Sequence, residues 1–249
     1  MGLITATPTS DAAIWHQLEC GSYTADLCLW RELARLHPDT PILDIGAGTG
    51  RVSIDLARCG RELIALDNDQ LLLQELLARE PHLGIRTFCA DARRFQLDKH
   101  EPLGLCLVPM QTLQLLGGRE GRLALLGCVR EHLADGGLLA LAIVTEVEDF
   151  DCRGMSIGPS PELARHGDAL YRSQAVRVSV EHRRIVIERQ RSIQTPAGFH
   201  SERNLISLDR LSSGQLIDEA ASVGLRPAGV RVIAPTNEHA GSEVVMLSG

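Results

Sequence analysis

Aromatic side chains are scarce in this sequence. They make up 3% of the 249 residues, as two tryptophans, two tyrosines and four phenylalanines. Aromatic rings are the groups that cage cationic ligands and stack on flat ones. The chain therefore has few rings with which to build such a cage.

An excess of positive charge is also lacking. The chain has 25 Lys and Arg against 32 Asp and Glu, which gives a formal net charge of −7. Such a chain offers no general attraction to a phosphate backbone or an anionic membrane surface. We therefore expect neither a nucleic acid nor a membrane as its partner.

The sequence has no long apolar run and no leader-like start. No run approaches the roughly 20 apolar residues needed to span a bilayer. Residues Met1 to Ser10 lack the basic and apolar regions of a signal peptide. These absences predict a cytoplasmic protein.

Paired cysteine spacings are absent as well. The seven cysteines stand apart from one another, so none forms the short paired spacing of a zinc or redox site. Several lie inside apolar runs, which is typical of reduced core thiols in a cytoplasmic protein. We expect no metal site.

What the sequence does contain is an alternation of short apolar runs and amphipathic stretches. The periodicity predicts a leading helix over Tyr23 to Leu36 and a long helix over Arg119 to Leu133. Apolar runs that alternate with helices in this way predict a doubly wound parallel sheet, buried on both faces. The expected strands of this first part are Pro41 to Ile45, Glu62 to Asp67, Gly84 to Cys89, Leu103 to Val108 and Gly137 to Val144.

The rhythm changes after Thr145. Residues 169 to 193 alternate in a strand-like way about a turn at 182 to 184, and Phe199 to Leu208 supplies a third strand. We interpret 146–208 as an inserted antiparallel unit that covers the substrate. A last helix over Ser213 to Val223 and two further strands complete a single domain of residues 1–249, in which 1–40 form a leading segment and helix.

A glycine loop, Gly46-Ala47-Gly48-Thr49-Gly50, lies between the first strand and the following helix. Without side chains, the backbone can approach a ligand closely, and the start of the helix offers free N–H groups. A dinucleotide site uses the same device, but its fingerprint needs glycine at the sixth position, where this chain has Arg51. An NAD-dependent oxidoreductase is thus a weaker alternative.

Two acidic positions at later strand ends extend this pattern. Asp67 ends the second strand, where a carboxylate can accept hydrogen bonds from both hydroxyls of a ribose. Asp91 and Ala92 follow the third strand, where a carboxylate and a backbone amide can contact the edge of a base. Asp69, two residues after Asp67, is the better candidate for capping the next helix.

Together these segments resemble the class I S-adenosylmethionine-dependent methyltransferases over roughly Pro41 to Val144. The matching segments are LDIGAGTGRVSIDLA, ALDND, CADARRF, LCLVPMQTLQLL and LADGGLLALAIV. The resemblance implies strand order 3-2-1-4-5-7-6, with only the seventh strand antiparallel. Small-molecule members such as glycine and sugar N-methyltransferases and natural-product tailoring enzymes are the most similar in size and in the insertion.

The resemblance also implies where the cofactor, S-adenosyl-L-methionine, would lie. The loop residues would contact its methionine part, with Asp44 behind the turn near the ammonium group and Tyr23 near the carboxylate or the acceptor. Asp67 and Asn68 would take the ribose. The full set implied for the cofactor is Tyr23, Asp44, Gly46, Ala47, Gly48, Gly50, Asp67, Asn68, Asp91, Ala92, Val108 and Gln111.

Methyl transfer is an in-line displacement, so the protein mainly has to align the acceptor with the S–CH₃ bond and exclude water. A base is needed only if the acceptor arrives protonated, and histidine suits that task. His16 and His200 lie in regions that fold over the acceptor in this family and are our candidates for catalysis. Glu146 and Glu148 follow the fifth strand, where a solvated loop is the simpler expectation.

The sequence therefore predicts an enzyme that transfers a methyl group to O or N of a small-molecule acceptor. The non-enzyme alternative is a methyltransferase-like protein that binds S-adenosylmethionine but does not transfer its methyl group. A homodimer is left open. The basic residues at 182–184, with Arg189 and Arg191, alternate along a strand, so we expect a solvated face rather than an anion site.

Overall fold

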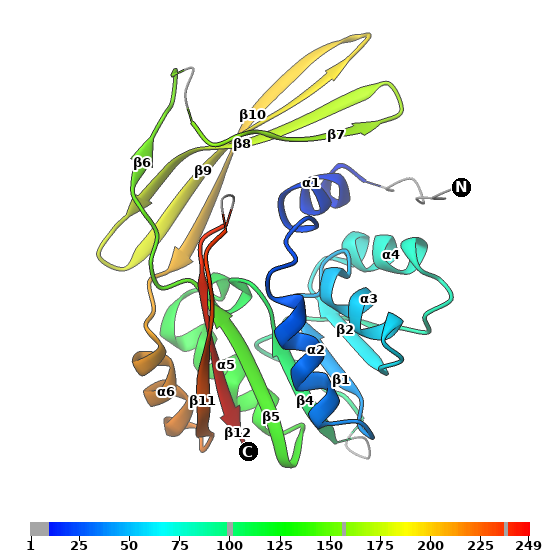
Figure 1. Cartoon of the computed structure of the whole chain (residues 1–249), viewed down its shortest axis with the longest axis vertical. Coiled ribbons are helices and arrows are strands. Elements are labelled where there is room, and N and C mark those ends of the chain that lie inside the picture. The colour runs from blue at the N-terminus through cyan, green and yellow to red at the C-terminus, as the bar shows by residue number, and fades with distance from the viewer. Residues whose placement is uncertain (1–9, 99–101, 156–157, 237–238) are drawn as a thin grey trace.

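The main sheet has seven strands in the order β11-β12-β5-β4-β1-β2-β3 (Figure 1). The computed structural model describes residues 10–98, 102–155, 158–236 and 239–249. Strands β1 to β5 are mutually parallel, whereas β12 is antiparallel to both β5 and β11. The predicted class, strand order and single antiparallel strand are confirmed. The strands are β1 (Ile42–Ile45), β2 (Leu63–Asp67), β3 (Arg86–Cys89), β4 (Leu103–Val108), β5 (Leu133–Ile143), β11 (Arg226–Ile233) and β12 (Ser242–Ser248).

Helices cover both faces of this sheet. One buried cluster joins α2, α3 and α4 to the sheet and includes Trp30, which is fully buried. A second cluster joins α5 and α6 to the opposite face. Every residue of β1, β2 and β4 is buried, because the sheet is covered on both sides. These helices are α2 (Leu27–Leu36), α3 (Arg51–Arg58), α4 (Gln70–Arg79), α5 (Gly118–Arg130) and α6 (Ser213–Ser222).

Capping side chains mark the residues at which two of the helices begin. Asp69 caps α4, since its carboxylate accepts a hydrogen bond from the Leu71 amide at 2.8 Å. Ser212 and Gln215 form a reciprocal capping box at the start of α6. The predicted role of Asp69 as a cap is confirmed, which leaves Asp67 free for another role.

A separate antiparallel sheet lies beyond the carboxyl ends of the parallel strands (Figure 1). Its strand order is β10-β9-β8-β6, and β7 pairs with β8. The chain enters it after β5 and returns to the main sheet through α6. Its strands are β6 (Phe150–Asp151), β7 (Glu162–His166), β8 (Ala169–Val180), β9 (Arg184–Thr195) and β10 (Gly198–Asp209).

The structure corrects our prediction for the leading segment. Instead of one helix from Tyr23 it has two, α1 (Asp11–Cys20) and α2 (Leu27–Leu36). Helix α1 starts at the cap Ser10, whose hydroxyl accepts from the Ala13 amide at 3.2 Å. It packs against α4 on one side and against β7 and β8 on the other. A helix covered on two sides has no single apolar stripe, so its periodicity was not evident.

All seven cysteines are free, but the expectation that they belong to the core is only partly right. Cys106 is buried, three are intermediate, and Cys28, Cys59 and Cys89 are exposed. Among the described residues, no helix is both long and apolar enough to cross a membrane.

Candidate functional site

The glycine loop joins the carboxyl end of β1 to the start of α3. Gly46, Gly48 and Gly50 have φ of +73°, +54° and +86°, the left-handed region that favours glycine. A Cβ at Gly46 would lie 2.5 Å from the Thr112 side chain, and one at Gly48 would lie 2.2 Å from the His16 ring. The loop is thus held in a tight turn with side chains packed directly on it.

Asp67 lies beside this loop, at the end of β2. One carboxylate oxygen accepts from the Gly48 amide at 2.8 Å and the other from the Asp69 amide at 2.9 Å. The residue is 9% exposed. Each carboxylate oxygen retains a free lone pair. The carboxylate can therefore accept two more hydrogen bonds, as a ribose diol would require.

Asp44 lies behind the turn and is 1% exposed. Its Oδ2 accepts from the Ser53 hydroxyl at 2.6 Å, while its buried Oδ1 has no hydrogen-bond partner. Burial raises the pKa of Asp44 to about 6, although the hydrogen bond from Ser53 acts to lower it. A buried, half-satisfied carboxyl group fits a site that receives a cationic group such as an ammonium.

We expect Asp44 to make the ligand-free protein less stable as the pH rises. The pKa of Asp44 is raised in the folded state. Its favourable contribution to the free energy of unfolding is therefore present near pH 4 and is lost as the pH rises through about 6. Between about pH 4.5 and pH 7 the free energy of unfolding should fall by about 2 kcal/mol relative to that of Asp44→Asn. Urea unfolding of both proteins at several pH values measures this difference. Parallel pH profiles for the two proteins would refute the assignment.

Arg51, which follows the loop, holds the leading segment in place. Its guanidinium donates to both carboxylate oxygens of Asp26, at 2.5 and 2.7 Å, and to the Tyr23 carbonyl at 2.9 Å. Asp26 also accepts from the Trp30 indole at 2.7 Å. Arg51 and Asp26 are 8% and 1% exposed. The residue that distinguishes this loop from a dinucleotide fingerprint therefore serves as a buried anchor.

Tyr23 lies at the carboxyl edge of the sheet. Its ring packs against His239 at 4.8 Å and under the Arg51 guanidinium at 5.1 Å. It is 5% exposed, and burial raises the pKa of its hydroxyl. Tyr23 precedes α2 rather than opening it, so it is positioned by Arg51 and not by helix geometry.

His16, on α1, lies directly on the glycine loop. Its Nδ1 is 3.1 Å from the Thr49 hydroxyl, which itself donates to Gln17 at 3.1 Å. We therefore assign the proton to Nδ1, which leaves Nε2 as a hydrogen-bond acceptor. Burial lowers the pKa of His16, although Asp67 and Glu19 oppose the effect. The ring is a neutral acceptor next to Gly48.

At the end of the third strand, the Asp91 side chain already has a partner within the chain. The Asp91 carboxylate pairs with Arg93, whose guanidinium nitrogens lie 2.7 to 3.1 Å from its oxygens. This pairing lowers the pKa of Asp91 to about 2. Ala92 is partly buried and Asn68 is exposed. Contact of Asp91, Ala92 and Asn68 with a cofactor stays a prediction.

The segment after β4 closes over the same edge. Val108 is fully buried, so its contact with a cofactor stays a prediction. Met110 has φ +54° without being glycine, a strain that costs about 1–3 kcal/mol and is concentrated at functional sites. Gln111 is partly exposed.

Sequence patterns did not reveal Gln114. Its buried amide hydrogen-bonds to both Val144 and Asp209, where the chain enters and leaves the second sheet.

The second candidate base, His200, lies far along the second sheet. It is on β10 near the turn to β9, 71% exposed, and 3.9 Å from Glu202. Among the described contacts, none joins it to the glycine loop. Glu146 and Glu148 are exposed in the loop after β5, as expected for a solvated segment.

The predicted solvated face of β9 is wrong for two arginines. Arg189 and Arg191 are 12% and 16% exposed because both face Glu19 of α1. Their burial was not predicted because α1 was not expected. The clue in the sequence to this burial was Glu19, an acidic residue in the leading segment that has no partner nearby in the sequence.

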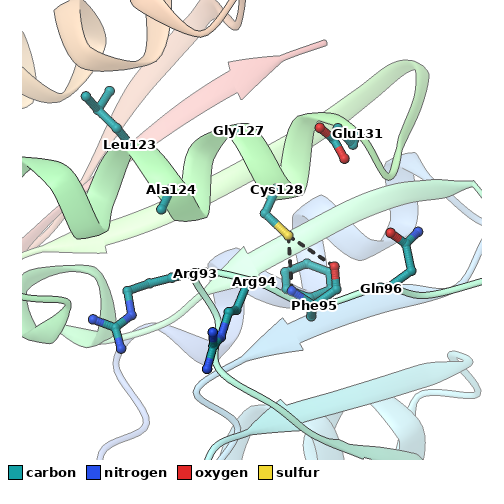
Figure 2. Close-up of a pocket in the computed structure, with 9 residues that line it drawn as sticks. All are labelled: Arg93, Arg94, Phe95, Gln96, Leu123, Ala124, Gly127, Cys128 and Glu131. Carbon is teal, nitrogen blue, oxygen red and sulfur yellow. Dashed lines mark hydrogen bonds between the residues drawn. The ribbon is translucent and has the colours of Figure 1, made fainter.

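A hollow lies on the α5 face of the main sheet and does not include the glycine loop (Figure 2). The Cys128 thiol at its wall contacts the backbone of Phe95 at 3.3 to 3.4 Å. The lining residues are Arg93, Arg94, Phe95, Gln96, Leu123, Ala124, Gly127, Cys128 and Glu131. The convergent polar groups described above lie elsewhere, so we do not place the site here. Within the described ranges, no cluster of three or more His, Cys, Asp or Glu could hold a metal ion.

The sequence of residues 42–137 matches the family described as a methyltransferase domain. No curated protein matches the chain. Among solved structures, the chain is similar to CalS10, an amino pentose methyltransferase from Micromonospora echinaspora involved in calicheamicin biosynthesis. The identity is 19%, the TM-score is 0.67, and 94% of each chain is covered.

Two further structures are similar over most of their length. The sugar N-methyltransferase KedS8 from Streptoalloteichus sp. is 12% identical, with a TM-score of 0.70 and 98% of each chain covered. The glycopeptide N-methyltransferase MtfA, complexed with S-adenosyl-L-homocysteine, is 19% identical with a TM-score of 0.61. That match covers 89% of this chain and 86% of that chain. At these identities the likeness establishes the fold.

Proposed function

Residues 42–137 match the family described as a methyltransferase domain, the chain has the fold of S-adenosylmethionine-dependent methyltransferases, and from this premise we propose what the chain acts on. We propose that it transfers a methyl group from S-adenosylmethionine to N or O of a small molecule, with an amine nitrogen favoured. The S-adenosylmethionine cofactor supplies an activated methyl group on a sulfonium. The protein supplies binding, alignment and exclusion of water.

One observation carries the proposal: Asp67 is fixed by the loop and still has free lone pairs. Its carboxylate is held by the amides of Gly48 and Asp69, so its position is set before any ligand binds. A preorganised carboxylate at the end of β2 suits a ribose diol. The orphaned Oδ1 of Asp44, behind the same turn, suits the ammonium of the methionine part.

The other contacts follow from the same arrangement. Gly46, Ala47 and Gly50 would present backbone to the methionine part, and Asn68 would lie beside the ribose. Ala92 and Asp91 would contact the adenine. Val108, Gln111 and Tyr23 would surround the reacting end of the cofactor.

The acceptor would enter between the second sheet and the carboxyl ends of β4 and β5. Glu146, Glu148 and Asp149 are exposed carboxylates directly after β5. Together with the net charge of −7, they favour a cationic amine over an anionic acceptor. The N-methyltransferases among the similar structures support the same choice.

A protonated amine must lose a proton before it can attack the methyl group. His16 is the better placed of our two candidate bases, because it is neutral and next to the glycine loop, whereas His200 is exposed on β10. The assignment of either residue to catalysis is a proposal. A cytoplasmic location and the absence of a nucleic-acid partner also remain predictions, and a homodimer is left open.

Methyl transfer from labelled S-adenosylmethionine tests this function. The acceptors should be matched pairs of small amino sugars and their hydroxyl analogues, with product detected by mass increase and by S-adenosylhomocysteine release. We expect methylation of one or more amines, or of an alcohol, that depends on the protein. Tight S-adenosylhomocysteine binding without methylation of any acceptor in a broad panel would favour a cofactor-binding protein instead.

A further inference from the structure

Helix α1 is the element that contacts both halves of the proposed site. It lies between the second sheet and the glycine-loop side of the main domain (Figure 1). His16 faces the loop, and Glu19, three residues later, faces the second sheet. A helix held on two sides by polar contacts can transmit a displacement of one side to the other.

Glu19 makes most of the polar contacts on the sheet side. Arg191 donates to both of its carboxylate oxygens at 2.7 Å, and the Ser173 hydroxyl donates to Oε1 at 2.7 Å. The Arg189 guanidinium lies 3.4 Å away. Burial alone would raise the pKa of Glu19, but the hydrogen bonds from Arg191 and Ser173, together with the charges of Arg189 and Arg191, outweigh burial and lower it. The Glu19 carboxylate is therefore an anion on a side chain that is 8% exposed, with two cations against it.

Aromatic contacts support the same docking. Trp15 lies edge-on to Tyr171 of β8 at 5.1 Å, and the Arg191 guanidinium lies 5.2 Å from the Trp15 ring centre. The Tyr171 hydroxyl donates to Asp11 at 2.8 Å. Helix α1 is thus bound to the second sheet along two of its turns.

On the other side, α1 covers the glycine loop. The edge of the His16 ring takes the space that a Cβ at Gly48 would fill, and Thr49 bonds to His16 and Gln17. Thr49 is fully buried. A cofactor on this loop would therefore lie beside α1.

We propose that Glu19 is a positioning residue that sets how tightly α1 holds the cofactor and ties release of the product cofactor to undocking of α1 from the second sheet. This inference rests on the proposed function. The bidentate pair of Glu19 and Arg191 is buried and directional. Breaking it therefore contributes most of the free-energy cost of separating α1 from the second sheet. The residue acts through His16 and the backbone of α1 and touches no reacting group.

The test is the rate at which bound S-adenosylhomocysteine leaves the full-length protein. Radiolabelled S-adenosylhomocysteine is bound and then chased with excess unlabelled compound. Glu19→Gln and Arg191→Gln should each speed release by at least about fivefold, and the double variant should release no faster than the faster single variant. Arg191→Lys, which keeps the charge without the planar fork, should fall between wild type and Arg191→Gln.

Glu32→Gln is the matched control, because Glu32 forms an exposed ion pair with Arg231 at 3.1 Å and lies away from α1. Its release rate should equal that of wild type. Unchanged release rates for Glu19→Gln and Arg191→Gln, with or without a lower melting temperature, would overturn the inference and leave a purely structural pair. Failure of wild type to bind S-adenosylhomocysteine would instead contradict the proposed function.

Discussion

Replacing Arg51 with methionine should lower the free energy of unfolding by about 3–5 kcal/mol. Arg51 is 8% exposed and neutralises Asp26, which is 1% exposed, through two hydrogen bonds. Methionine keeps much of the side-chain volume but leaves the Asp26 carboxylate buried without its cation. Of the side-chain donors named above, only the Trp30 indole would continue to donate to it. Chemical unfolding followed by circular dichroism measures the loss.

Two variants separate the buried charge from other effects. Arg31→Met removes a bidentate pair with Asp55 in which the arginine is 40% exposed, so its cost should stay below about 1 kcal/mol. Adding Asp26→Asn to Arg51→Met should recover part of the lost stability, because no uncompensated charge then remains. A loss for Arg51→Met no larger than that for Arg31→Met would show that the pair does not anchor the leading segment.

Gly48→Ala should have the second large effect, on both stability and cofactor binding. The left-handed φ of +54° costs a non-glycine residue about 1–3 kcal/mol. The new Cβ would also lie 2.2 Å from the His16 ring, so the ring or α1 must move away from the loop. S-adenosylhomocysteine affinity should fall by at least about tenfold, since a loss of about 1.4 kcal/mol suffices. Calorimetry on the folded variant measures the affinity.

The chain provides a control for the backbone strain alone. Gly60 has φ +81°, and a Cβ added there would meet no atom within 4 Å, so Gly60→Ala adds strain without a clash. It should destabilise the protein modestly and leave cofactor affinity unchanged. Combining Gly48→Ala with His16→Ala should restore stability relative to Gly48→Ala. Equal effects of Gly48→Ala and Gly60→Ala would mean that His16 does not press on the loop.

The parallel sheet could be predicted from the sequence because its signals are local. Strands β2 and β4 are apolar or glycine up to their ends, β1 is interrupted only by Asp44, and β1 and β2 end where glycine or aspartate stands. The resemblance implied the order of the strands and the antiparallel β12. The boundaries of β3 and β5 were less accurate, since exposure at their ends weakens the apolar pattern.

Helix α1 could not be predicted in the same way, because its contacts come from residues far along the chain. Glu19 finds its partners more than 150 positions later, in β8 and β9. Without them, Arg189 and Arg191 are indistinguishable from a solvated strand face. The buried pair of Arg51 and Asp26 was missed for the same reason: ion pairs between distant segments leave no periodic signal.

Within the site, sequence patterns located the parts whose position depends on the backbone. They located the contacts between side chains less well. The glycine loop and Asp67 are adjacent because both are at the carboxyl ends of neighbouring parallel strands. The contact of His16 with Gly48, and the pairing of Asp91 with Arg93, depend on side-chain packing that no spacing rule contains.

The proposed role of Asp67, holding the ribose of S-adenosylmethionine beside the glycine loop, is the central claim. Calorimetric titration of S-adenosylhomocysteine into wild type and folded Asp67→Ala tests it most directly, with Asp69→Ala as the control that removes only the cap of α4. We predict about 1.5–3 kcal/mol weaker binding for Asp67→Ala, little change for Asp69→Ala, and no binding of NAD by wild type. Unchanged affinity for Asp67→Ala, or tight NAD binding by wild type, would contradict this claim.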